Sequence, residues 1–318
     1  MDPRDLQKEL LKIKETSIPH AKLYIGGLIA TSSFAIFFGG SWLDAIVSAV
    51  FSVLICAMMI YLRPLTPNTI IFDFLASLIS GIGICITAHL VNDLSLGMVM
   101  IGDIMILIPG VAMTSAFRDM IAGDTVSGTM RLIESCLWAS ALALGFMAAM
   151  LLFGIDGEDI NSNAAPPIQL VAAIFGSIGF AIFFNVRNRL LWLCTLGGFL
   201  AESVYLIAMN IGLPWSDNRF ITVAIAAIFA AIFSEALSKK LKVPTTIFFI
   251  VSVIPLIPGR GLYFTMQCAV QQDWAKCADF AISTLQIALG IAVGIVIVWA
   301  LVQAFQSILY KRRELSSC

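Results

Sequence analysis

Long apolar runs separated by short polar segments make up most of the chain. Most of these runs are about twenty residues long, the length of an α-helix that crosses a bilayer. The pattern predicts ten membrane-spanning helices, and the last run is long enough for its helix to continue beyond the membrane. We expect the spans at about 22–40, 43–62, 70–90, 97–117, 129–153, 167–185, 189–211, 220–237, 244–268 and 278–309.

The composition supports a membrane protein. Of the 318 residues, 59% are hydrophobic and 12% are charged, and the mean hydropathy is +0.95. A soluble domain carries about twice this share of charged residues. The fold class that we expect is therefore an all-α polytopic membrane protein.

The basic residues predict the orientation in the membrane. If the N-terminus is cytoplasmic, the ten spans place all of the 19 lysines and arginines on the cytoplasmic side except Arg219, Arg260 and Lys276. Cytoplasmic loops of membrane proteins are enriched in basic residues. We therefore expect both termini in the cytoplasm.

Two short motifs recur in the same order and indicate an internal repeat. FAIFF occurs at 34–38 and again at 180–184, and LIPG occurs at 107–110 and again at 256–259. The chain therefore reads as five spans followed by five. Because five is odd, the second half enters the membrane from the opposite face, which makes an inverted repeat.

The repeat predicts a domain division. We expect a cytoplasmic N-terminal segment and two five-helix repeats joined by a periplasmic linker, followed by a cytoplasmic tail. The N-terminal segment covers 1–21 and the tail covers 311–318. The two repeats cover 22–154 and 167–310, and the linker between them covers 155–166.

Both LIPG motifs place a proline and a glycine inside a predicted span. Proline removes an amide donor and glycine tolerates unusual backbone angles, so Pro109-Gly110 and Pro258-Gly259 are expected to break spans four and nine. Backbone that is not helical at this depth needs protein or a water-filled cavity beside it. A packing kink is the alternative. Two breaks in matching positions favour a substrate site, since transporters with inverted repeats bind substrate between broken helices.

Charged residues surround the first break. Asp103 lies inside the fourth span, where a carboxylate is costly, and is a candidate for contact with a substrate ammonium or for proton coupling. The alternative is an acid near the outer interface that water reaches. Glu134 is a proton-coupling candidate too, although an ion pair with Arg131 is equally compatible with their spacing. Further candidates for substrate binding follow the break at Thr114, Arg118, Asp119 and Asp124. For the three charged residues, a helix cap and a solvated loop are the alternative.

The second half offers fewer polar candidates. Arg260 directly follows the second Pro-Gly pair and is a candidate for substrate binding or gating. Tyr263 is a second binding candidate, since it offers a hydroxyl group nearby. Glu202 lies within the seventh span and is expected to pair with Arg260 or to carry a proton. We interpret Asp44, Asp73 and Glu235 as mainly structural, because they lie near span ends.

Other functional classes lack support in the sequence. No Walker loop, nucleophile triad or zinc-ligand spacing occurs, so we expect no enzyme activity, metal or cofactor. The net charge of −1 gives no indication of a nucleic-acid partner. Among the seven cysteines, Cys268 and Cys277 flank a polar loop and form a disulfide only if that loop faces an oxidising compartment.

A GxxxG motif at Gly290 and Gly294 permits close helix packing in the tenth span. The partner helix belongs either to the same chain or to a second copy, so a homo-oligomer is one possibility.

Two motifs together resemble one family. The stretch PGVAMTSAFRDMIAGDTVSGTMRLIE at 109–134 and the stretch IPLIPGRGLYFTM at 254–266 are similar to the threonine/serine exporter family, and the resemblance covers essentially the whole chain. It implies proton-driven export of small hydroxy amino acids across the bacterial inner membrane. A related two-subunit form resembles dicarboxylate exporters.

The favoured interpretation is thus a proton-coupled secondary transporter that exports threonine or serine by alternating access. Its partners are an amino-acid substrate, protons and membrane lipid. A small-dicarboxylate exporter is the alternative within transport, and a passive channel is the alternative from another class.

Overall fold

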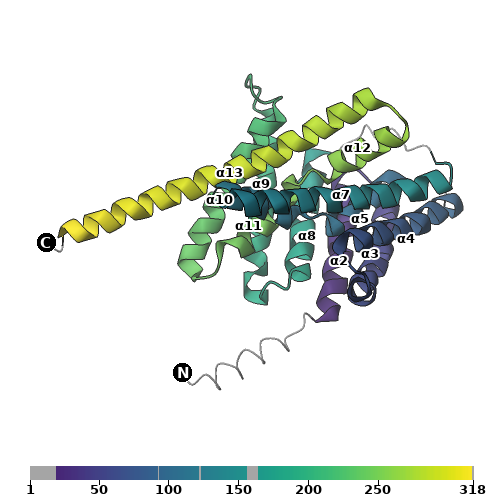
Figure 1. The fold of residues 1–318 in the computed structure, drawn as a ribbon, viewed down its shortest axis with the longest axis horizontal. Coiled ribbons are helices and arrows are strands. Elements are labelled where there is room, and N and C mark those ends of the chain that lie inside the picture. The colour runs from purple at the N-terminus through teal and green to yellow at the C-terminus, as the bar shows by residue number, and fades with distance from the viewer. Residues whose placement is uncertain (1–18, 92, 122, 156–163, 317–318) are drawn as a thin grey trace, which may run out of the picture.

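The structure is a computed structural model that describes residues 19–91, 93–121, 123–155 and 164–316. Helices are the only regular elements in these ranges, which confirms the predicted all-helical class (Figure 1). With η marking short 3-10 helices, they are α2 (His20–Phe37), α3 (Trp42–Tyr61), η1 (Arg63–Leu65), α4 (Thr69–Leu90), α5 (Leu96–Leu107), α6 (Gly110–Ile121), α7 (Thr125–Leu152), α8 (Pro166–Phe183), η2 (Asn188–Leu190), α9 (Leu191–Asn210), α10 (Arg219–Leu241), α11 (Thr245–Val253), η3 (Ile254–Leu256), α12 (Gly259–Val270) and α13 (Trp274–Ser316).

Several helices can cross a membrane, so the chain is a multi-pass membrane protein. Within the described residues, seven helices are long and apolar enough, and an eighth span results if the bent pair Thr245–Leu256 and Gly259–Ala269 counts as one. The ten spans of the sequence prediction are therefore not established. Part of the difference lies in α5 and α6, which have 12 residues each. A helix of that length is about 18 Å long and cannot cross a core of about 30 Å alone.

Helix α5 lies at the centre of the molecule. Each of its residues from Leu96 to Leu107 is buried, and it contacts α2, α3, α4, α7 and α12. Its N-terminus is fixed by Asp44 of α3, whose fully buried carboxylate accepts hydrogen bonds from Ser41 N at 2.7 Å and Ser95 N at 2.8 Å. The carboxylate thus caps α3 and ties it to the start of α5, which agrees with the structural role expected for Asp44.

Helices α2 and α8 cross at close range. A Cβ atom on Gly179 would lie 2.5 Å from Ala30 N, and one on Gly26 would meet the backbone of Phe183, so only glycine permits this approach. Beside the glycines, the rings of Phe34 and Phe180 meet edge to face. This crossing joins the first part of the chain to the second.

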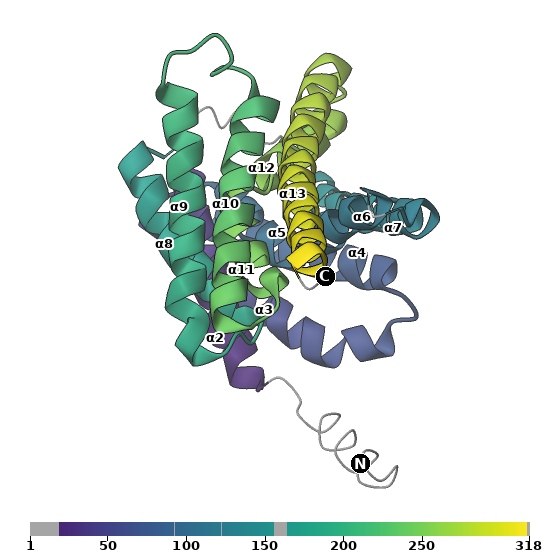
Figure 2. The ribbon, with the colours of Figure 1, turned by 90° about the vertical axis from the view of Figure 1, so that its left-hand side faces the viewer.

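The second part of the chain forms a row of neighbouring helices. Figure 2 shows α8, α9 and α10 side by side, with α11 against α9 and α10. Helix α13 has 43 residues and is about 65 Å long, so it exceeds a bilayer core as expected. Gly290 and Gly294 of α13 pack against α10 of the same chain, at Phe220 and Ala227 respectively. The GxxxG motif is therefore used within the protomer.

Candidate functional site

A cavity of about 740 Å³ lies where the two parts of the chain meet. Residues on both sides of the first predicted break line it, including Ile108 and Ala112, whereas at the second break only residues before Pro258 do, such as Ile254 and Ile257. The other lining residues are Leu23, Met59, Arg63, Thr69, Phe72, Asp73, Met105, Ile106, Leu107, Pro109, Ser115, Arg131, Glu134, Trp138, Phe180, Phe183, Phe184, Phe249, Ile250 and Val253.

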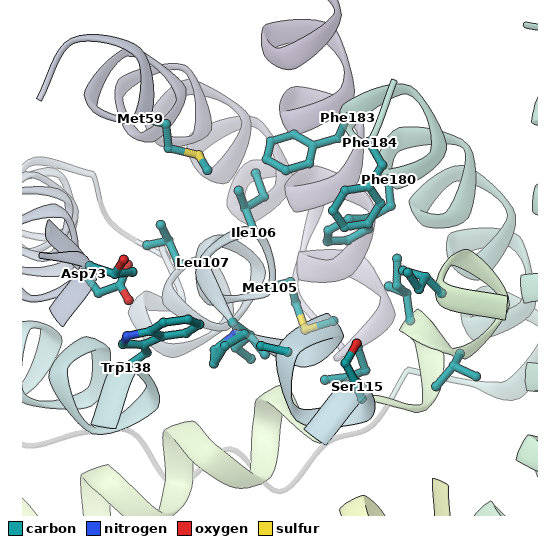
Figure 3. A pocket seen from close by; sticks show the side chains of 18 of the residues that line it. Met59, Asp73, Met105, Ile106, Leu107, Ser115, Trp138, Phe180, Phe183 and Phe184 are labelled. Atoms are coloured by element: carbon teal, nitrogen blue, oxygen red, sulfur yellow. The ribbon is translucent and has the colours of Figure 1, made fainter. Parts of the chain in front are cut away.

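The cavity wall is mostly apolar and aromatic, with a small polar set. Figure 3 shows Asp73 and Trp138 on one side, Phe180, Phe183 and Phe184 on the other, and α5 with Leu107 between them. Apolar walls with a few polar groups are typical of sites that bind small molecules. The polar lining side chains are those of Arg63, Thr69, Asp73, Ser115, Arg131, Glu134 and Trp138.

Asp73 is the most buried of the charged residues in the cavity. It belongs to the first turns of α4, and 4% of its surface is exposed. Within the described residues its carboxylate accepts no hydrogen bond and forms no ion pair, although the Arg63 guanidinium interacts with it electrostatically. The sequence interpretation of Asp73 as a structural residue near a span end missed this position in the cavity wall.

Arg63 enters the cavity from η1. Its guanidinium lies over the ring of Phe72 at 5.9 Å from the centroid, and no described carboxylate lies within ion-pair distance of it. Arg131 differs, because its Nη1 lies 3.0 Å from Asp119 Oδ2. In the part of the chain that the structure describes, Arg131 therefore pairs with Asp119 of α6 and not with Glu134, and the exposed side chain of Glu134 lines the cavity instead.

The helices restart in the same way after both Pro-Gly pairs. The first helical hydrogen bond of α6 runs from Met113 N to Pro109 O at 3.0 Å, and that of α12 runs from Leu262 N to Pro258 O at 3.2 Å. The two breaks also touch each other. Gly259 lies against Met105 and Ile108, and a Cβ atom on it would lie 2.5 Å from Met105 Sδ, so a larger residue there would displace the first break.

Asp103 is fully buried in α5, six residues before Pro109. Its Oδ1 accepts a hydrogen bond from Ser48 Oγ of α3 at 2.8 Å, whereas Oδ2 has no partner among the described residues. The alternative expectation, an acid at the outer interface reached by water, is wrong because no part of the side chain is exposed. Asp103 is not a lining residue of the cavity, so it does not touch a ligand bound there.

Two family comparisons identify the relatives of this chain. Residues 1–153 match the family described as "Putative threonine/serine exporter", and residues 169–301 match the family described as "Threonine/Serine exporter, ThrE". The chain belongs to the threonine/serine exporter family. This confirms the resemblance carried by the two sequence motifs.

One curated relative is distant in sequence. A curated "Threonine/serine exporter" of Corynebacterium glutamicum is 20% identical over 287 residues, which cover 85% of this chain and 58% of that protein. The chain thus spans less than two thirds of the length of this exporter. No solved structure matches the chain.

The exporter motif of the first half is only partly gathered in the cavity. Pro109 lines it, and Asp119 is held at its edge by the lining residue Arg131. Asp124 is exposed and occupies the N-cap position of α7, but its side chain makes no capping hydrogen bond. Gly110 begins α6, and the side chains of Thr114 and Arg118 lie outside the described part of the chain.

The candidates of the second half lie away from this cavity. The Arg260 guanidinium stacks on Phe264 at 5.1 Å, and the fully buried ring of Tyr263 meets Phe264 edge to face. Glu202 of α9 is 1% exposed, with no partner for Oε2 among the described residues. None of these three residues lines the cavity.

The described residues also bear on the expectations for metal sites and for a disulfide. They contain no group of three or more histidine, cysteine or acidic residues that could hold a metal. Cys268 and Cys277 both carry thiols, so the conditional disulfide is not formed, and Cys277 Sγ instead donates to Thr265 O at 3.3 Å.

Sequence reasoning missed Asp73, Arg63 and Trp138 as cavity residues. One signal for Asp73 was available, because it interrupts the apolar run TIIFDFLASLIS at 69–80 just as Asp103 interrupts its own run. Arg63 and Trp138 carry no such signal, since an arginine at a helix end and a tryptophan in a span are ordinary in membrane proteins.

Proposed function

We propose that this protein is a proton-coupled secondary transporter that exports threonine and serine from the cytoplasm by alternating access. The observation that carries the proposal is the cavity of about 740 Å³, because Pro109 of the first Pro-Gly break lines it together with Ile254 and Ile257, which precede the second break. Substrate sites between paired broken helices are typical of secondary transporters. The printed name of the Corynebacterium glutamicum relative supplies the substrate class.

An inverted repeat of five plus five helices underlies the proposed mechanism. Equivalent contacts in the two halves support it. Helix α4 packs on α7 as α10 packs on α13, and α6 packs on α7 as α12 packs on α13. The division into repeats at 22–154 and 167–310 follows from this proposal, with α2 and α8 as corresponding helices that cross at Phe34 and Phe180.

The cavity then belongs to the cytoplasmic side. Its lining residues Arg63 and Arg131 lie near the helix ends that the positive-inside rule assigns to the cytoplasm. With both termini cytoplasmic, this arrangement would be an inward-facing state in the bacterial inner membrane. Rocking of one repeat against the other would open the opposite side, where Arg260 and Tyr263 are candidates for contact with the departing substrate.

Asp103 is the proposed centre of proton coupling. Its Oδ2 atom has no donor among the described residues and is the position where a proton would bind. It lies in the helix that leads into the first break, so its protonation state acts on the geometry of that break. Glu202, with its own unpartnered oxygen, and Glu134 in the cavity wall are secondary proton sites.

The cavity favours amino acids over dicarboxylates. Asp73 and Glu134 line it together with Arg63 and Arg131, and a wall with both charges matches a zwitterion better than a dianion. A passive channel is also disfavoured, since a channel does not require a buried carboxylate such as Asp103.

Flux into proteoliposomes of the purified protein tests the proposal. Labelled threonine, serine and succinate are compared with and without an imposed pH gradient. Threonine or serine flux stimulated by the gradient is the expected result. Succinate flux would replace the proposal by the dicarboxylate exporter, and amino-acid flux that ignores the gradient would replace it by a channel.

A further inference from the structure

We propose that Asp73 and Arg63 bind the two charged ends of the transported amino acid, with Asp73 holding the α-ammonium and Arg63 the α-carboxylate. This inference rests on the proposed function and names the groups that select its substrate class. The juxtaposition that carries it is one carboxylate and one guanidinium in the same cavity wall, neither of them paired within the described protein.

The burial of Asp73 is the first argument. A carboxylate that is 4% exposed loses most of its hydration, and proteins normally compensate this cost with donors or a cation. No described residue donates a hydrogen bond to the Asp73 carboxylate, and the interaction with Arg63 exceeds ion-pair distance. A ligand with several N–H donors, such as a primary ammonium, would donate the hydrogen bonds that the described residues do not.

The position of Arg63 is the second argument. Its guanidinium rests on the ring of Phe72, the residue directly before Asp73 in α4. A cation on an aromatic face keeps its N–H groups free to point elsewhere. Here these donors remain available for an anion, and a carboxylate is the anion that a planar guanidinium binds most specifically.

The other charged residues of the cavity suit this assignment less well. Both arginines are exposed, but Arg131 already pairs with Asp119, whereas Arg63 has no described carboxylate within ion-pair distance. Of the two carboxylates, Glu134 is exposed, so water can hydrate it, whereas Asp73 is buried. Asp103 is buried behind the cavity wall and does not line it. Recognition at Asp73 and proton coupling at Asp103 would thus be separate tasks for separate carboxylates.

Binding of three ligands to purified protein tests this pairing without relying on transport. The ligands are L-threonine, N-acetyl-L-threonine, which lacks the ammonium, and L-threonine methyl ester, which lacks the carboxylate. Affinities are measured by calorimetric titration for wild type, Asp73→Asn and Arg63→Gln. Asp279→Asn and Arg189→Gln are matched controls, because both residues are exposed and neither lines the cavity.

A matched pattern of losses is expected. Threonine should bind about ten- to a hundredfold more weakly to Asp73→Asn and to Arg63→Gln, since each lacks one charge-assisted contact. Acetylation should cost wild type at least tenfold in affinity but cost Asp73→Asn less than threefold. Esterification should likewise cost wild type at least tenfold in affinity but cost Arg63→Gln less than threefold. Both control variants should bind all three ligands like wild type.

Two results would overturn the pairing while the proposed function stands. One is wild-type affinity for threonine in Asp73→Asn, and the other is a parallel loss of all three ligands, which indicates general damage. Failure of wild type to bind either threonine or serine would instead overturn the proposed function, and this inference with it.

Discussion

The rings of Phe34 and Phe180 meet edge to face, with centroids 5.7 Å apart and planes at 73°. These two residues begin the two copies of the FAIFF motif, so the repeated sequence packs against itself where α2 crosses α8. Each is surrounded by the later phenylalanines of its own motif, at 34–38 and 180–184. The crossing therefore joins the two halves through equivalent residues.

Replacing Phe180 with leucine should destabilise this crossing. An edge-to-face pair contributes about 0.5–1.5 kcal/mol beyond the area that it buries, and this contribution is lost with the ring. The melting temperature of the purified protein measures the effect. Phe175→Leu is the control, because Phe175 lies on the same helix but is 54% exposed. Equal shifts for the two variants would contradict a specific role of the Phe34–Phe180 contact.

Replacing Asp44 with alanine should lower the stability of the protein more than replacing Phe180 with leucine. The amides of Ser41 and Ser95 would lose their buried acceptor, and each unsatisfied group costs about 1–3 kcal/mol. We expect a clear decrease in the melting temperature and faster proteolysis around residue 95, since α5 loses its anchor. Asp279→Ala, at an exposed position, should leave both unchanged. Wild-type stability of the Asp44 variant would show that the two amides find other acceptors.

A double-mutant cycle can separate the two possible partners of Arg131. Its side chain is 46% exposed, so its pair with Asp119 should contribute no more than about 1 kcal/mol, and less at high salt. Combining Arg131→Gln with Asp119→Asn should give a measurable coupling energy in thermal or chemical unfolding. The same cycle with Glu134→Gln should give a value near zero. A larger coupling to Glu134 would restore the pairing expected from the sequence.

Asp103→Asn should separate transport from proton coupling. The amide oxygen can still accept the hydrogen bond from Ser48, but the side chain can no longer carry a proton. We expect exchange of threonine for threonine across the membrane to persist while stimulation by a pH gradient falls at least tenfold. Glu235→Gln, outside the cavity, is the control and should keep the stimulation. An undiminished response of Asp103→Asn to the gradient would move the coupling site elsewhere.

The sequence predicted the helical class and the family well because both depend on local patterns. Apolar runs identify membrane helices, and the motif at 109–134 lies within the range that matches the exporter family. The sequence also predicted where α5 ends and α6 begins, because proline and glycine change the backbone of the residues next to them.

Side-chain partners were harder to predict because they depend on how helices pack. Arg131 and Glu134 have the spacing of an ion pair on one helix, yet Arg131 turns to Asp119 on the neighbouring α6. The position of Asp73 in the sequence indicated an interface, whereas the packing of α4 against α7 and α5 places it in a cavity wall. Such contacts between distant segments leave no periodic signal in one sequence.

The movement of protons driven by threonine itself tests proton-coupled export most directly. Proteoliposomes with a trapped pH-sensitive dye are given an outward or inward threonine gradient, with no pH gradient imposed and the membrane potential clamped. We expect protons to move against the threonine flux in wild type and not in Asp103→Asn. Threonine flux in wild type without any proton movement would contradict coupling and leave a facilitator or channel in its place.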